Sequence, residues 1–133
     1  MSRLLIFAIA ASGLAACAPV HNVERDQRAA MHFDAEIAGL AAGRPMSCLP
    51  PRSTATVVAA RGATLLFREG NAVYANETSG GCADIADRQY TLVTESFSGS
   101  LSRGSLAKVV DLSAGGIIRG TCVLGDFTPF RRP

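Results

Sequence analysis

The residues of this chain best able to do chemistry are its four cysteines, Cys17, Cys48, Cys82 and Cys122. Thiols can carry lipid, bind a metal, act as nucleophiles or form disulfides. The spacing contains no Cys-x-x-Cys pair, which disfavours a zinc site. Both histidines, His21 and His32, lie N-terminal to the last three cysteines, so no nearby imidazole is expected to activate a thiol. The sequence therefore predicts no metal, no cofactor and no catalytic residue.

The first of these cysteines follows a segment typical of secretion signals. Arg3 supplies a positive charge, residues 4–14 are apolar, and small residues precede Cys17. The apolar run is about half the length needed to span the ~30 Å hydrocarbon core of a bilayer. The four residues Leu14-Ala15-Ala16-Cys17 resemble the lipobox of bacterial lipoproteins at all four positions.

The lipobox resemblance implies a lipid anchor at Cys17. In such proteins the cysteine thiol is diacylated, the chain is cut just before it, and the new amine is usually acylated as well. Two or three acyl chains give a stable anchor where one does not. Ala18 follows the cysteine, and the absence of Asp there favours the outer membrane. We therefore expect a lipid-anchored protein of the Gram-negative cell envelope that faces the periplasm, with the membrane as a partner.

The expected organisation is one domain behind its leader: residues 1–16 form the signal peptide, 17–22 a tether, 23–43 an amphipathic helix and 44–131 a β-domain. The chain carries 13 basic and 11 acidic residues, and the charges are interspersed. That distribution gives nucleic acid no basic surface to bind.

The helix is predicted from apolar residues at three-and-four spacing over residues 23–42. Asn22 is a candidate N-cap, while Gly43 and Pro45 should end the helix. Its polar face is not rich in Lys or Arg, so we expect packing against the domain rather than on a membrane surface. The apolar face is formed by Ala30, Phe33, Ile37, Leu40 and Ala41.

The rest of the chain alternates short β segments with Gly, Ser, Asn and Pro turns. Six strands are predicted, at 54–60, 63–68, 72–77, 88–97, 107–112 and 117–123. Residues 124–129 are expected to end the fold. The fold class is therefore mainly β, a small antiparallel sheet or barrel preceded by one helix.

With Cys17 acylated, an odd number of cysteines remains in an oxidising compartment. One disulfide and one free thiol are expected. The pairing Cys48–Cys122 is favoured because it would tie the approach to the first strand to the last strand, stabilising the fold by roughly 4 kcal/mol. The pairing Cys48–Cys82 is the alternative.

Residues 48–130 also resemble a family of small Gram-negative lipoproteins that carry a domain of unknown function. Members have a fourth cysteine in a Leu-Cys-x-Gly-Asp segment, where this chain has Ser102 and, at the aspartate position, Ser105. That departure accounts for the odd number of cysteines, and the resemblance implies no activity. The matching segments are Cys48-Leu49-Pro50, Leu65-Leu66-Phe67-Arg68, Tyr74-Ala75-Asn76, Cys82-Ala83-Asp84-Ile85 and the stretch from Cys122 to Pro129.

Three functions are compatible with these observations. The favoured one is a non-enzymatic envelope lipoprotein whose β-domain binds a protein partner or has a structural role. The alternative is an inhibitor of a cell-wall-degrading enzyme such as lysozyme, by analogy of size, location and fold. The third is a thiol-redox protein that uses the unpaired cysteine.

Overall fold

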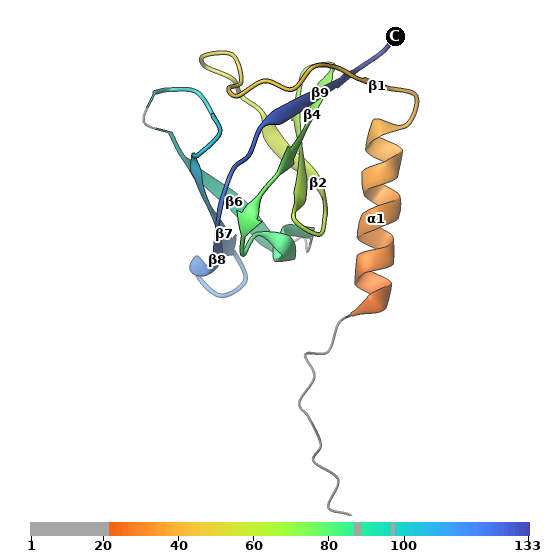
Figure 1. Ribbon diagram of the computed structural model, residues 1–133. Coiled ribbons are helices and arrows are strands. Elements are labelled where there is room, and N and C mark those ends of the chain that lie inside the picture. The colour runs from red at the N-terminus through yellow and green to blue at the C-terminus, as the bar shows by residue number, and fades with distance from the viewer. Residues whose placement is uncertain (1–21, 87–88, 97) are drawn as a thin grey trace, which may run out of the picture.

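The computed structural model describes residues 22–86, 89–96 and 98–133, so the signal peptide, Cys17 and most of the tether lie outside the described residues. One helix covers the outer face of a five-stranded antiparallel sheet, and a four-stranded antiparallel sheet packs on its inner face (Figure 1). The prediction of a mainly β fold with an N-terminal helix is confirmed.

The elements fall into these three layers. The helix α1 spans Val23–Ile37. The five-stranded sheet has the order β1-β9-β4-β3-β2, with β1 at Ala41–Ala42, β2 at Thr56–Arg61, β3 at Thr64–Glu69, β4 at Ala72–Glu77 and β9 at Phe127–Arg131. The four-stranded sheet has the order β5-β8-β7-β6, with β5 at Ser79–Gly80, β6 at Tyr90–Glu95, β7 at Leu106–Asp111 and β8 at Ile117–Val123. A short 3-10 helix, η1 at Ala83–Ala86, precedes β6.

Helix α1 begins and packs as predicted. The Asn22 side chain accepts a hydrogen bond from the backbone N–H of Arg25 at 3.2 Å, which caps the first turn. Phe33 is 2% exposed and packs with Leu66 and Val73 on the outer face of the five-stranded sheet. The guanidinium of Arg61 lies 4.3 Å from the centre of the Phe33 ring and closes over it.

The helix is shorter than predicted, because it ends at Ile37 rather than near Gly43. Ala38 leaves helical geometry with ψ at 130°, and Gly39 adopts a φ of 74° that favours glycine. The chain then extends, and β1 pairs with the edge of β9. Residues 41–42, which the three-and-four spacing of apolar residues had placed in the helix, therefore form a strand beside β9 instead.

Each of the six predicted strands has a counterpart, from β2 to β4 and from β6 to β8, but the end of the fold was predicted wrongly. Residues 127–131 form β9, which lies between β4 and β1 inside the five-stranded sheet. Pro129 lacks a backbone N–H and argued against a strand there. Its carbonyl nevertheless accepts a hydrogen bond from the N–H of Gly43 at 2.7 Å, so the strand is held on both sides.

The main core lies between the two sheets. Phe67 of β3 and Phe127 of β9 meet edge to face, with ring centres 5.7 Å apart. Across from them lie Val109 of β7 and Leu124, both almost fully buried. The inner faces of both sheets are therefore occupied by apolar side chains, as expected for packed sheets.

The two sheets are joined along one side, where the chain passes from one to the other. Asn76 of β4 is fully buried, and its side-chain amide exchanges two hydrogen bonds with the backbone of Gly125, at 2.8 and 2.9 Å. A Cβ atom at Gly125 would collide with the carbonyl oxygen of Glu77. The amide of Asn76 thus takes the place of a strand neighbour for the segment that leads into β9.

A disulfide between Cys82 and Cys122 lies at the same side and is fully buried. One disulfide and one free thiol were predicted for Cys48, Cys82 and Cys122, and among these three described cysteines both are present, with Cys48 free. The favoured pairing Cys48–Cys122 is wrong, as is the alternative Cys48–Cys82. The reason is that β5 pairs with the end of β8 and brings Cys82 to Cys122, whereas β9, and not β8, is the last strand.

We predict that the double variant Cys82→Ala with Cys122→Ala loses about 4 kcal/mol of unfolding free energy, the chain-entropy value for a closed loop of this size. The sequence separation of the pair is 40 residues. Urea denaturation would measure the loss. The matched control Cys48→Ala removes the exposed thiol and should change stability by less than about 0.5 kcal/mol. Equal stability of the double variant and the control would contradict the assignment.

Candidate functional site

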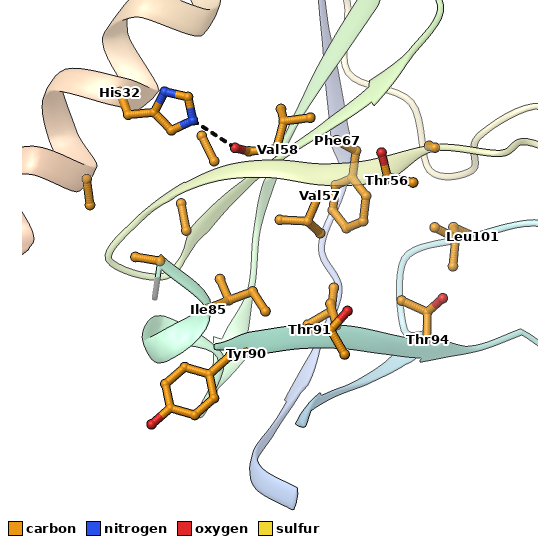
Figure 2. Close-up of a pocket in the computed structure, with 16 residues that line it drawn as sticks. His32, Thr56, Val57, Val58, Phe67, Ile85, Tyr90, Thr91, Thr94 and Leu101 are labelled. Atoms are coloured by element: carbon orange, nitrogen blue, oxygen red, sulfur yellow. Dashed lines mark hydrogen bonds between the residues drawn. The ribbon is translucent and has the colours of Figure 1, made fainter. Parts of the chain in front are cut away.

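The side of the molecule where the sheets are not joined carries an open seam between β2 and β6. Each of these strands is the last in its sheet, so within the part of the chain that the structure describes each has one edge without a neighbouring strand. A cavity of about 480 Å³ lies between them. Figure 2 shows Val57 and Phe67 on one side and Thr94 on the other, with Ile85 toward one end and Leu101 toward the other.

The described lining of the seam carries no formally charged acidic or basic side chain and mixes apolar groups with hydroxyl groups. None of its described lining residues is Asp, Glu, Lys or Arg. The hydroxyls come from Tyr90 and from three threonines, Thr56, Thr91 and Thr94. Apart from His32, the remaining lining residues have small or apolar side chains, most of them alanine, valine and leucine. Such a cavity can hold a ligand by apolar contact and hydrogen bonds, with no ionic contribution from these residues.

Strand β6 also offers backbone groups to the seam. Gln89 accepts a hydrogen bond from the N–H of Leu112, and the register then pairs Tyr90 with Asp111. In an antiparallel pair, hydrogen-bonded residues alternate with residues whose N–H and C=O point away from the partner strand. The free backbone groups of β6 therefore belong to Tyr90, Leu92 and Thr94, and they point toward the open edge.

Helix α1 forms the rim of the seam on the β2 side. A β-bulge between Val57 and Ala59 turns Val57 toward the sheet interior and Val58 toward the helix. The ring nitrogen Nε2 of His32 lies 3.1 Å from the carbonyl oxygen of Val58 (Figure 2). This bond satisfies a backbone group that the bulge releases from the ladder, and it fixes the helix beside the seam.

The cysteines proposed from the sequence do not gather at the seam. Cys17 lies outside the described residues, and Cys82 with Cys122 forms the buried disulfide on the joined side. Cys48 is exposed and forms an isolated antiparallel bridge with Ser102, whose hydroxyl hydrogen-bonds to the Cys48 thiol. Ser102 therefore faces the free thiol directly.

We predict that Ser102→Cys forms a second disulfide with Cys48, because directly opposed residues of an antiparallel bridge have Cβ atoms within bridging distance. Thiol titration of the denatured protein should find no free thiol among the cysteines of residues 22–133 after oxidation. Stability should rise by up to about 4 kcal/mol.

The control variant Ser105→Cys places a thiol in the same loop but not opposite Cys48. It should retain two titratable thiols. Two free thiols in Ser102→Cys as well would show that the two backbones do not face each other.

The strongest charged cluster lies outside the seam, at the turn between β7 and β8. Asp111 is 2% exposed. Its carboxylate accepts hydrogen bonds from the hydroxyl and N–H of Ser113, at 2.6 and 2.9 Å, and from the N–H of Ala114 at 3.2 Å. Arg119 donates from Nε and Nη2 at 3.2 and 3.1 Å.

This environment has an electrostatic consequence. The hydrogen bond from the Ser113 hydroxyl, followed by those from Arg119 and the backbone, lowers the pKa of Asp111 against the opposing effect of burial. The cluster therefore holds the turn in one conformation at neutral pH.

We predict that this cluster makes stability depend on pH. Because the pKa of Asp111 is lower in the folded state, its contribution is complete above the ordinary Asp range and is lost as pH falls through the folded value. Asp111→Asn should lower the unfolding free energy at neutral pH and flatten its dependence between about pH 5 and pH 2.

The control Asp34→Asn removes an exposed partner of Arg61, and should cost under about 1 kcal/mol. Chemical denaturation across that pH range measures both variants. An unchanged pH profile in Asp111→Asn would contradict the prediction.

Within the described ranges, no three side chains of His, Cys, Asp or Glu gather where they could hold a metal ion. Nor does that part of the chain contain a helix long and apolar enough to cross a membrane. Sequence reasoning missed the seam, since Val57, Leu92 and Leu101 look like ordinary core residues. The one signal in the sequence was the polar Thr94 at an inward-facing position of a strand.

Comparisons with protein families, with curated proteins and with solved structures found no match to this chain.

Proposed function

We propose that this protein is a lipid-anchored, non-enzymatic binding module of the cell envelope, and that an extended, uncharged segment of a partner protein binds in the seam between β2 and β6. The observation that carries the proposal is the pair of open strand edges on either side of a cavity that no Asp, Glu, Lys or Arg among the described residues lines. An extended peptide can satisfy free edge groups by adding a strand, while alternate side chains enter the cavity.

Three properties of the seam support binding over catalysis. Its described lining has no carboxylate, lysine or arginine. Its one histidine, His32, uses Nε2 to hold the carbonyl of Val58. The conspicuous ionic group, Asp111 with Arg119, stabilises a turn elsewhere. A general acid or base must reach the reacting atoms. The described side chains at the seam instead offer apolar surface and hydroxyl groups that can bind a ligand.

The anchor is supported by the lipobox at Leu14-Ala15-Ala16-Cys17. Acylation of Cys17 would keep the domain at the membrane surface, where a partner of the envelope is concentrated. The domain begins directly after a short tether, at the N-cap Asn22. Its site would thus be presented close to the membrane.

Site-specific photocrosslinking in intact cells tests the proposed seam. A photoreactive amino acid replacing Thr94, which lines the cavity, should give a discrete crosslinked adduct. The matched control is Thr121, the same residue type on the exposed face of β8. It should give no such adduct.

Mass spectrometry of the adduct should identify an uncharged extended segment in the partner. Adducts at both positions, or at Thr121 alone, would contradict binding in the seam, and so would a Thr94 variant that folds normally but captures nothing.

A further inference from the structure

The hairpin turn between β7 and β8 exposes apolar side chains that the proposed function does not use. Leu112 is 62% exposed, and Ile117 and Ile118 are each 54% exposed. The sequence from Leu112 to Ile118 contains no charged residue. We name residues 112–118 the apolar tip. Single exposed apolar residues are common, but three on one uncharged turn are a patch that water solvates poorly.

The apolar tip is held in a fixed conformation. Asp111 accepts hydrogen bonds from Ser113 and Ala114 through its carboxylate, and from the N–H of Gly116 through its carbonyl at 2.9 Å. Because the turn is already ordered, placing it against another surface costs little conformational entropy. Three backbone N–H groups of the turn, those of Ser113, Ala114 and Gly116, are also satisfied internally, which lowers the cost of moving them into an apolar environment.

The position of the tip relative to the chain's start suggests which surface it meets. The turn between β7 and β8 and the first turn of α1 both lie at the lower end of the molecule in Figure 1. Val23, at the start of α1, is 62% exposed. The turn between β3 and β4, which contains Asn71 in the sequence, and the C-terminus lie toward the opposite end (Figure 1).

The length of the tether limits how far this end can be from a bilayer. Between Cys17 and Val23 the chain has only residues 18–22. Fully extended, it spans about 20 Å at 3.3–3.6 Å per residue. An acylated Cys17 would therefore keep the start of α1 within that distance of the lipid headgroups, on the same end as the apolar tip.

We propose that the apolar tip, residues 112–118, is a second membrane contact that enters the interface of the bilayer holding the Cys17 lipid. This inference rests on the lipid anchor of the proposed function. The contact would fix the orientation of the domain, so that the seam is held at a set height and angle above the membrane. Uncharged turns with Leu and Ile suit the boundary between headgroups and acyl chains.

An environment-sensitive fluorophore on the lipidated chain tests the proposal. In a Cys48→Ser background, Ala114→Cys is labelled with the fluorophore NBD at the tip, and Asn71→Cys is the control at the opposite end. The full mature protein, purified from membranes, is reconstituted into vesicles of phosphatidylethanolamine and phosphatidylglycerol. We expect blue-shifted emission at position 114, quenched several-fold by lipids with nitroxide groups on their acyl chains. Position 71 should show neither effect. Adding Ile117→Glu to the Ala114→Cys chain should abolish both effects.

The outcomes separate the tip from the anchor, because the mass of the N-terminal peptide is measured on the same sample. An acylated chain with position 114 as exposed to water as position 71 would overturn the tip contact and leave the anchor intact. A blue shift without quenching by lipid nitroxides would also overturn it, and would indicate a second protein chain on the tip. A chain without acyl groups would overturn both proposals.

Discussion

The structure depends on the buried junction where the chain passes between its two sheets. There the amide of Asn76 exchanges hydrogen bonds with the backbone of Gly125, and the disulfide of Cys82 and Cys122 ties β8 to the segment after β5. A buried amide is costly unless both its donor and its acceptor are satisfied, and here a single backbone residue satisfies both. The glycine requirement at Gly125 follows from the same close approach.

Because the chain joins the two sheets along one side, the strand edges on the other side are not tied to each other by that junction. The edges of β2 and β6 are the furthest in their sheets from the junction strands, and no third strand among the described residues closes them. Instead, η1 contacts both strands at one end of the gap, while α1 covers the bulged part of β2. The rigid junction thus permits an open seam without loss of the core between Phe67, Phe127 and Val109.

The proposed anchor and apolar tip would fix the orientation of the molecule relative to the membrane. The start of α1 and the turn between β7 and β8 lie at one end, so a tether of a few residues would place that end at the membrane. The seam runs between the sheets above it, flanked by β2 and β6. An extended partner segment would then meet a site whose orientation toward the bilayer is set.

Much of the fold followed from the sequence because its signals are local. The cap at Asn22, the apolar periodicity around Phe33 and the alternation in β4 depend on near neighbours along the chain. The failures all involved distant pairing. The strand around Pro129 exists because β4 and Gly43 bond to it, and α1 ends early because residues 41–42 pair with that strand.

The disulfide was misassigned for the same reason, since its pairing depends on which strand adjoins β5. The seam was hidden because its lining residues are of the types that fill cores. Whether such a residue is covered depends on which strand edges pair, and apart from the polar Thr94 the two edge strands carry no signal of this in their own sequences. That Ser102 lies opposite Cys48 likewise depends on the fold and on no local signal in the sequence.

The most direct test of the central claim, an open seam between β2 and β6, is residue-resolved amide hydrogen exchange in the unliganded protein. The N–H groups of Tyr90, Leu92 and Thr94 should exchange many times faster than those of Thr91 and Val93, which bond to β7. This alternation is expected only if β6 is a free edge. Uniform protection along β6 would mean that the seam is closed, and would contradict the binding site proposed for this protein.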